Sequence, residues 1–200
     1  MATAAAYACP VDDDLRETTL GSRVIHRGRY LSFRVDTIAD AAGERREREV
    51  VEHPGAVVIV ALLGQDVLMV RQWRTPVGGV LLELPAGTLD RLASGATEDP
   101  DVAAARELAE ETGYAAGRWR SLARFYTAPG FTDELMHLYL ATDLRAIPDH
   151  PGPAPDEHLR VERLPWRTAV SMAESGELRD AKSLVGLLRL ARLSEQGDLT

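Results

Sequence analysis

The pattern of apolar and polar positions divides the chain into strand-like and helix-like segments. Apolar and polar residues alternate along residues 30–38, as in a strand with one buried face. An uninterrupted apolar run at residues 56–63 and a segment at residues 67–73 that begins with four apolar residues, joined by Gly64-Gln65-Asp66, predict a buried hairpin. Residues 100–112 are rich in Ala, Leu and Glu and predict a helix. Further strands are predicted at residues 23–26, 46–52, 80–84, 119–126, 135–141 and 159–164, and further helices at residues 165–174 and 180–193.

Capping residues border the predicted helix at residues 100–112. Asp99 can accept hydrogen bonds at its N-terminus, Pro100 suits the first helical position, and Gly113 can end it in the left-handed conformation. The face expected to pack on a sheet is small or apolar and consists of Val102, Ala105, Leu108, Ala109 and Thr112. A second packing stripe is expected on the last helix, at Leu184, Leu187, Leu188 and Ala191.

Three carboxylates gather on the other face of the helix at residues 100–112. Glu107, Glu110 and Glu111 are three or four positions apart, or adjacent, so a helix brings their like charges together. An isolated acidic group of this kind is ordinarily a solvated helix face. Here Glu98 precedes the group, and Leu84-Pro85-Ala86-Gly87 predicts a tight turn upstream. Oxygen ligands clustered in this way suit Mg²⁺ or Mn²⁺.

Composition and charge exclude several classes of protein. The chain has 200 residues, 45% of them hydrophobic, enough for one moderate domain with a small appendage. A net charge of -8 argues against a nucleic-acid partner. The longest apolar run, at residues 56–63, is far shorter than the about 20 residues of a membrane helix, so no membrane partner is expected. A single cysteine, Cys9, and an N-terminus unlike a signal peptide predict a cytoplasmic protein.

The segment from Gly87 to Tyr114 resembles the signature of the Nudix hydrolases. In that signature a glycine is followed by five residues, a glutamate, seven residues and Arg-Glu-apolar-any-Glu-Glu-any-Gly-apolar, and Glu98 with residues 106–114 match it without a gap. Ten residues separate Gly87 from Glu98, which we interpret as a five-residue insertion in the loop at residues 89–97. The resemblance implies an α+β fold, a Nudix-type α/β/α sandwich of mixed sheet and helices with a small N-terminal antiparallel sheet.

The resemblance also implies roles for the residues of the signature. The metal ligands would be the carbonyl of Ala86 and the side chains of Glu107, Glu110, Glu111 and Glu134. They would hold more than one Mg²⁺ or Mn²⁺ ion per site. Arg106 is expected to pair with Glu98 or Glu110 and to fix their orientation, with Gly87 also supporting the ligands.

The stretch before the signature resembles the ADP-ribose pyrophosphatase branch of the family. Arginines at a strand end are often plain surface charges, but a guanidinium can hold a diphosphate through forked hydrogen bonds. In that branch the arginine matching Arg74 contacts the substrate; Arg71 is a weaker candidate, and Glu83 is a candidate to orient a neighbour. Aromatic residues that could stack on adenine are Tyr30, Phe33 and Trp73, although Trp73 is equally a core candidate.

The loop at residues 127–134 supports the same branch. Its Pro129 follows Tyr114 by fifteen residues, within an Ala-Pro-Gly-Phe-Thr-Asp-Glu run typical of ADP-ribose hydrolases. The glutamate matching Glu134 is a general base or a further metal ligand there, and both roles stay open. This resemblance implies cleavage of ADP-ribose into AMP and ribose 5-phosphate. The alternatives are another nucleoside diphosphate derivative, such as a nucleotide sugar or dinucleotide, and a non-catalytic ligand-binding Nudix domain.

The predicted domain organisation has three parts: a flexible N-terminus at residues 1–20, an N-terminal β-sheet dimerisation region at residues 21–54 and a Nudix hydrolase domain at residues 55–200. The small sheet has too few apolar groups to be stable alone. In enzymes that resemble this one, such a sheet is exchanged or packed across a homodimer. Residues 143–157 contain four Pro and predict a mobile connector, and His150 and His158 are expected on the surface.

Overall fold

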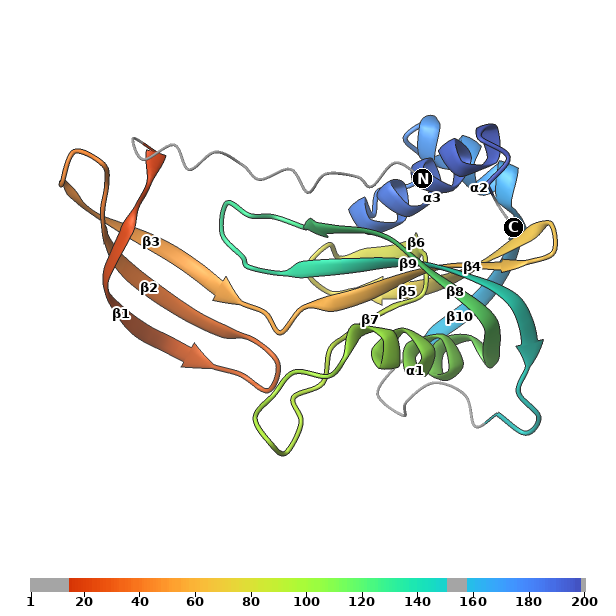
Figure 1. The fold of residues 1–200 in the computed structure, drawn as a ribbon, viewed down its shortest axis with the longest axis horizontal. Helices are drawn as coiled ribbons and strands as arrows, with labels where there is room; N and C mark the ends of the chain where they lie inside the picture. The colour runs from red at the N-terminus through yellow and green to blue at the C-terminus, as the bar shows by residue number, and fades with distance from the viewer. Residues whose placement is uncertain (1–14, 151–157, 199–200) are drawn as a thin grey trace. The chain divides into compact units, whose positions relative to one another are not determined.

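The computed structural model describes residues 15–150 and 158–198. The described residues divide into two compact units (Figure 1). The first consists of the chain up to His53 together with Gly130–Asp133, and the second of Pro54–Pro129 together with the chain from Glu134 onward. Each unit has its own sheet, and each is described separately below.

A three-stranded antiparallel sheet forms the first unit. Its strands, in spatial order, are β1 (Thr18–Arg27), β2 (Ser32–Ala39) and β3 (Arg45–Glu52). β1 starts five residues earlier than predicted because it pairs with β2 along its whole length, beginning with Thr18 opposite Ala39. Residues 18–20, predicted to belong to a flexible N-terminus, therefore lie in a strand. The loop residues 130–133 join this unit because Phe131 and Asp133 both accept hydrogen bonds from the end of β3 and the residue after it.

A seven-stranded mixed sheet forms the centre of the second unit. Five strands lie in the order β10 (Leu159–Pro165), β5 (Asp66–Arg74), β4 (Ala56–Leu63), β9 (Leu135–Ala146) and β8 (Tyr114–Tyr126). Two short strands complete it, β6 (Gly79–Glu83) beside β5 and β7 (Ala86–Thr88) beside β4. β4 and β9 run parallel, and the other pairs are antiparallel.

β4 and β5 form the predicted hairpin, but they stay paired only next to its turn, where Leu62 faces Val67. Farther from the turn, β5 pairs with β6 and β4 pairs with β7 instead. The connection from β6 to β7 runs beside β4, where the Ile59 N–H donates to the Pro85 carbonyl at 2.9 Å. The segment predicted as a tight turn thus continues into a short strand, which is fixed to the centre of the sheet.

Helices cover both faces of this sheet (Figure 1). α1 (Pro100–Thr112) packs on one face, and α2 (Trp166–Glu174) with α3 (Ala181–Glu195) packs on the other. The side chains of β4 alternate between the two cores: Val57, Ile59 and Ala61 join α1, whereas Val58, Val60 and Leu62 join α2 and α3. The predicted α+β class and α/β/α sandwich are confirmed.

Two helix faces differ from the predicted ones. In α1 the buried residues are Ala103, Ala104, Glu107, Leu108, Glu111 and Thr112. Val102, expected in the core, is 59% exposed, because two of the carboxylates occupy the inward side instead. In α3 the buried residues are Ser183, Gly186, Leu187, Leu190 and Leu193. Leu188 is exposed because the helix approaches the sheet at Gly186, where a Cβ atom would lie 2.5 Å from the Leu84 side chain.

The predicted connector after residue 142 is partly a strand. β9 continues to Ala146, since its last residues pair with the start of β8 at Tyr114. Residues 151–157 of the connector lie outside the described residues. His150 forms a hydrogen bond with the backbone carbonyl of Glu110 (3.1 Å), and His158 is exposed. Within the described ranges, every helix is too short or too polar to cross a membrane.

Candidate active site

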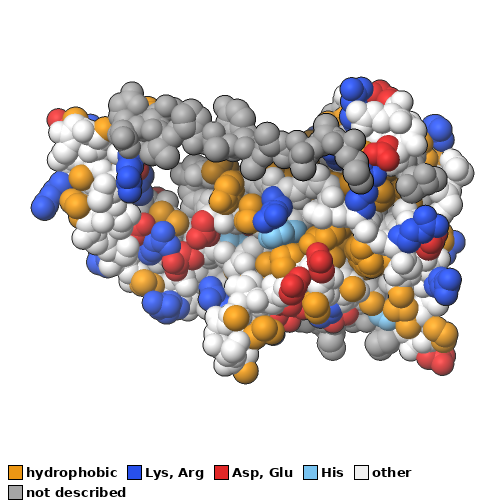
Figure 2. Space-filling model, in the orientation of Figure 1, with side chains coloured by type: hydrophobic (Ala, Val, Ile, Leu, Met, Phe, Trp, Pro, Cys, Tyr) orange, Lys and Arg blue, Asp and Glu red, His pale blue; other side chains and the backbone are white. Residues whose placement is uncertain are grey.

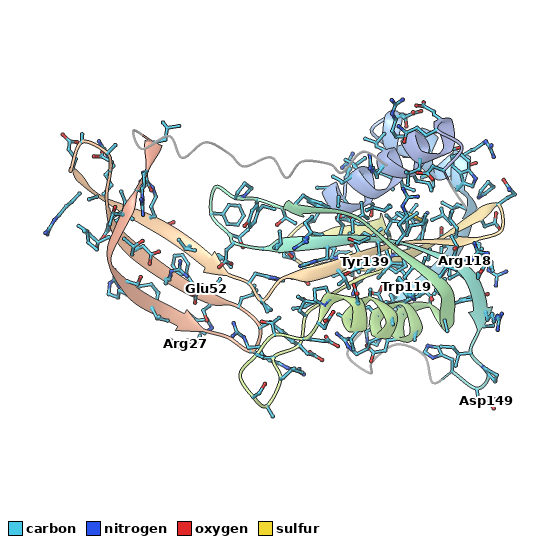
Figure 3. The ribbon with its side chains drawn as sticks, in the orientation of Figure 1. Arg27, Glu52, Arg118, Trp119, Tyr139 and Asp149 are labelled. Atoms are coloured by element: carbon cyan, nitrogen blue, oxygen red, sulfur yellow. The ribbon has the colours of Figure 1, made fainter. Side chains whose placement is uncertain are left out.

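The helix that carries the signature carboxylates is fixed at both ends. At its N-terminus the Asp99 side chain accepts a hydrogen bond from the Asp101 N–H (2.8 Å), and at its C-terminus Gly113 has φ 73°, as the sequence predicted. The Tyr139 hydroxyl of β9 donates to the Asp101 carboxylate at 2.6 Å. Tyr139 packs edge-on against Trp119 of β8, with ring centroids 6.1 Å apart (Figure 3). Burial, together with the Asp101 carboxylate, raises the Tyr139 pKa, so the hydroxyl remains a donor.

Two of the three carboxylates face the strand β7 rather than solvent. Glu107 and Glu111 are 7% and 5% exposed. The Glu111 carboxylate accepts a hydrogen bond from the Ala86 N–H at 3.0 Å. The Glu107 carboxylate lies so close to Gly87 that a Cβ atom there would be 1.9 Å from its carboxyl carbon. Glycine is therefore required at this signature position by the position of the acid itself.

Arg106 connects the acidic residues around the helix. Its Nη1 donates to Glu107 at 2.7 Å and to Glu110 at 3.0 Å. Its Nε and Nη2 donate to the two carboxylate oxygens of Glu98, at 3.1 and 2.7 Å. These hydrogen bonds, above all those with Glu98, raise the Arg106 pKa and lower the Glu98 pKa. The sequence predicted pairing with Glu98 or Glu110, and the structure has both.

The insertion between Gly87 and Glu98 forms a small hairpin. Arg91 and Thr97 pair as an antiparallel bridge, and the turn between them contains Gly95 with φ 84°. At the base of the hairpin, the Glu98 N–H donates to the Asp90 carbonyl (2.8 Å), while the Asp90 N–H donates to the Glu98 carboxylate (3.2 Å). The extra residues are therefore accommodated locally, and Glu98 still reaches Arg106.

Arg74 and Glu83 form a forked pair on neighbouring strands. The Arg74 Nε and Nη2 donate to the two oxygens of the Glu83 carboxylate, each at 2.7 Å. Glu83 is completely buried and also accepts a hydrogen bond from Lys182 of α3. Burial favours its neutral form, but Arg74 and Lys182 outweigh that effect and lower the Glu83 pKa. Lys182 was not among the predicted site residues, because it lies 99 residues from Glu83 in the sequence and no local pattern links the two.

The structure does not bring Arg71 and Trp73 together with Arg74. Side chains alternate along β5, so Arg71 and Trp73 project from the face opposite Arg74. Arg71 donates to Glu162 of β10 at 2.5 Å and lines a cavity of about 260 Å³ beside α2 and the connection from α2 to α3. Trp73 is 57% exposed and is not a core residue.

The remaining site candidates lie on a loop and in the first unit. Glu134 is half-buried, and the Thr127 hydroxyl donates to its carboxylate at 2.5 Å. Tyr30 is 50% exposed, with the Arg29 guanidinium 4.8 Å from its ring centroid, and Phe33 is half-buried in β2. Over the described ranges, no three His, Cys, Asp or Glu side chains converge into a ready-made metal-binding group. The predicted ligands on α1 are instead held by Arg106 and by the backbone of β7.

Known proteins resemble this chain over most of its length. An ADP-ribose pyrophosphatase of Bacillus subtilis (strain 168) is 35% identical over 170 residues, which are 84% of this chain and 89% of the relative. An ADP-ribose pyrophosphatase of Mycobacterium tuberculosis is 38% identical over 85% of this chain and 81% of its own. A methanol dehydrogenase activator of Bacillus methanolicus is 35% identical over 86% of this chain and 90% of its own.

A solved structure has the same fold. The crystal structure of an ADP compounds hydrolase superposes with a TM-score of 0.73 and 24% identity, covering 92% of this chain and 98% of that one. Residues 52–185 match the family profile of the NUDIX domain. This match includes the signature helix, the forked pair on β5 and β6, and the loop that carries Glu134. The chain belongs to the NUDIX family, as its signature segment led us to expect.

Proposed function

We propose that this protein hydrolyses the diphosphate bond of ADP-ribose and releases AMP and ribose 5-phosphate. The observation that carries the proposal is the packing of Glu107 and Glu111 against β7, because two buried acids held beside a backbone strand form a site for a cation rather than a solvated helix face. Two of the relatives that match most of the chain are named ADP-ribose pyrophosphatase, which supports this substrate.

Nudix hydrolases generally depend on a divalent metal ion, and the donors present here fit such an ion. All are hard oxygen atoms, which suit Mg²⁺ or Mn²⁺. The residues that would hold more than one ion are Glu107, Glu110 and Glu111 with the Ala86 carbonyl, and Glu134 is a further candidate. When bound, such ions neutralise the diphosphate oxygens and make a water molecule more acidic. Arg106 fixes the carboxylates in position through its bonds to Glu107 and Glu110.

Two other residues act on the substrate in this proposal. Arg74 holds the diphosphate. Its forked pair with Glu83 uses Nε and Nη2, so Nη1 can still donate hydrogen bonds to the substrate. Glu134 activates or positions the attacking water, or serves as a metal ligand, and its hydrogen bond from Thr127 fixes one carboxylate oxygen. Arg71 and Trp73 face away from Arg74 and are weaker candidates for substrate contact.

The second candidate is another nucleoside diphosphate derivative, such as a nucleotide sugar or a dinucleotide. The signature residues determine the hydrolysis step, whereas residues elsewhere in the site determine which substrate is preferred. A non-catalytic binding domain would not need Glu98, Arg106, Glu107, Glu110 and Glu111 together.

The test is hydrolysis of ADP-ribose, ADP-glucose and NADH, with AMP and the second product resolved by chromatography. We expect a higher kcat/KM for ADP-ribose than for the other two, and no turnover after chelation of the metal. Preferential cleavage of ADP-glucose or NADH would support the hydrolase activity but would contradict ADP-ribose as the substrate. Failure to cleave any of them, with Mg²⁺ and then with Mn²⁺, would favour the binding domain.

We also propose a cytoplasmic homodimer in which the first unit supplies the interface. All ten residues of β1 are exposed, including Leu20, Val24 and Ile25, and such an apolar strand surface is expected to be covered in solution. Sedimentation analysis should give twice the mass of the 21.9 kDa chain. Val24→Asp should lower that mass to one chain, and an unchanged mass would exclude β1 from the interface.

A further inference from the structure

The first residues of α3 hold two consecutive residues at the end of β6. Asp180 caps the helix: its Oδ2 accepts hydrogen bonds from the N–H and hydroxyl of Ser183, at 3.0 and 2.5 Å. The Ser183 hydroxyl oxygen in turn accepts from the Leu84 N–H at 2.7 Å. The Lys182 ammonium donates to Glu83 and, at 2.9 Å, to Asp180 Oδ1. A helix start is thereby joined to the strand that leads into the signature segment.

Glu83 is the point at which this arrangement reaches Arg74. Its Oε1 accepts from the Arg74 Nε, and its Oε2 accepts from both the Arg74 Nη2 and the Lys182 ammonium. One edge of the guanidinium is therefore fully occupied. The Arg74 Nη1 makes no hydrogen bond with any described residue, and the side chain is 37% exposed. A forked partner that approaches from solvent would meet this remaining edge.

We infer that Lys182 is a positioning residue, which acts through Glu83 to hold Arg74 in the orientation that receives the diphosphate. The inference rests on the proposed function, in which Arg74 contacts the substrate. Lys182 keeps the Glu83 carboxylate from rotating, because Glu83 Oε2 accepts hydrogen bonds from both Arg74 and Lys182. Asp180 in turn holds the Lys182 ammonium in place. With Arg74 alone, the pair would be neutral, whereas Lys182 adds a second positive charge beside the same carboxylate.

Asp180 balances the charge of Lys182 and holds its ammonium at 2.9 Å, so Lys182 acts by fixing the position of the Glu83 carboxylate. Asp180 lies at the N-terminus of α3, where the helix dipole and the Ser183 N–H stabilise a carboxylate. The Lys182 side chain is only 12% exposed, so its bond to Glu83 is shielded from water and salt. The Lys182 ammonium donates to Glu83 and Asp180, and its effect on Arg74 passes through Glu83.

The first test compares steady-state kinetics of ADP-ribose hydrolysis in the full-length wild-type protein, Lys182→Met, Lys182→Arg and Arg189→Met. Arg189→Met removes one positive charge from an exposed position on the same helix and is the matched control. We expect Lys182→Met to raise KM about fivefold with kcat within about twofold, since binding through Arg74 weakens. Lys182→Arg should restore most of the loss, and Arg189→Met should behave as wild type. An unchanged KM, or a loss confined to kcat and thermal stability, would overturn the inference.

A double mutant and a spectroscopic signal then separate this inference from the proposed function. Lys182→Met should add little to the KM of Arg74→Met, whereas a full additional fivefold increase would show that Lys182 acts independently of Arg74. In NMR spectra, the Arg74 Nε–H signal should be shifted and slowly exchanging in the wild type and should lose that protection in Lys182→Met. If the wild type cleaves no ADP-ribose, the proposed function fails, and this signal alone decides whether Lys182 orients Arg74: retained protection in Lys182→Met would refute it.

Discussion

The two sheets of this protein differ in how much of their surface is buried. In the second unit both faces are covered by helices, and β4 is buried along almost its whole length. In the first unit only Asp36 and Ile38 are buried among the described residues, and all of β1 is exposed. Figure 2 shows basic, acidic and apolar side chains intermixed on the visible face of that sheet. The second unit can be stabilised by its own core, whereas the first has almost no core.

This difference in burial determines which unit can hold buried carboxylates for catalysis. The second unit buries Glu83, Glu98, Glu107 and Glu111, and each accepts a hydrogen bond or ion pair. Burying several carboxylates is costly unless the surrounding fold supplies both the donors and the stability. In the first unit the ion pairs are mostly exposed, such as Arg46 with Asp40 and Glu44, and add little to stability. The large core therefore supports an acidic site that the small sheet could not maintain.

The largest expected effect is a loss of catalytic activity when a carboxylate of the second unit, but not of the first, is neutralised. Glu111→Gln should lower kcat roughly 1,000-fold, because glutamine can still accept the Ala86 N–H but no longer carries the charge that a cation needs. The matched control is Glu47→Gln, which makes the same change at an exposed position of β3 and should retain full activity. Initial rates and circular dichroism decide the outcome. Activity of Glu111→Gln within a few-fold of wild type would remove Glu111 from the proposed ligands.

The features of the fold and the site that could be predicted from the sequence are those with local determinants. Asp99 and Gly113 defined the helix, and the spacing of its acids placed Glu107 and Glu111 together. The same reasoning placed Val102 in the core, because hydrophobicity alone cannot indicate that a carboxylate will be the inward group. Burial of Glu107 depends on a glycine twenty positions away, which no periodicity within the helix contains. The role of Lys182 depends on a strand 99 residues earlier and could not be predicted from local pattern.

The second effect compares the stability of the two units. Leu108 is completely buried against the sheet, and Leu108→Ala should lower the free energy of unfolding by about 3 kcal/mol. Val24 in β1 is 40% exposed within a single chain, and Val24→Ala should cost less than about 0.5 kcal/mol when it is measured at a protein concentration low enough to dissociate the proposed dimer. Urea denaturation followed by fluorescence measures both. Equal losses would mean that β1 is packed as tightly in solution as the core of the second unit.

The third effect tests the close approach of Gly87 to Glu107. Gly87→Ala places a methyl group where the carboxylate now lies, so the acid must move, and kcat should fall roughly 10- to 100-fold. Gly21→Ala in β1 is the control, since no atom lies within 4 Å of the added Cβ. Rates and melting temperatures of both variants should be measured together. If Gly87→Ala kept wild-type kcat, the close approach of Gly87 to Glu107 would have no catalytic meaning.

The smallest effect is a difference in acid sensitivity. Hydrogen bonds from Arg106 lower the Glu98 pKa, and those from Arg34 lower the Asp36 pKa. A carboxyl whose pKa is lower in the folded state contributes stability that is fully present above its ordinary pKa and is lost as the pH falls through the folded value. The loss should therefore begin below pH 4.5 for Glu98 and below pH 3.8 for Asp36.

Glu98→Gln and Asp36→Asn separate these two contributions. Each variant should be less stable than wild type at pH 7, and its free energy of unfolding should fall less steeply on acidification, because one proton-binding group of the unfolded chain is gone. Urea titrations at half-unit pH intervals provide the comparison, and the flattening should start at the higher pH in Glu98→Gln. If neither slope changed, the pairs with Arg106 and Arg34 would be too weak to favour the ionised carboxylates in either unit. If the slope changed only in Glu98→Gln, an ion pair would favour the ionised carboxylate in the second unit but not in the first.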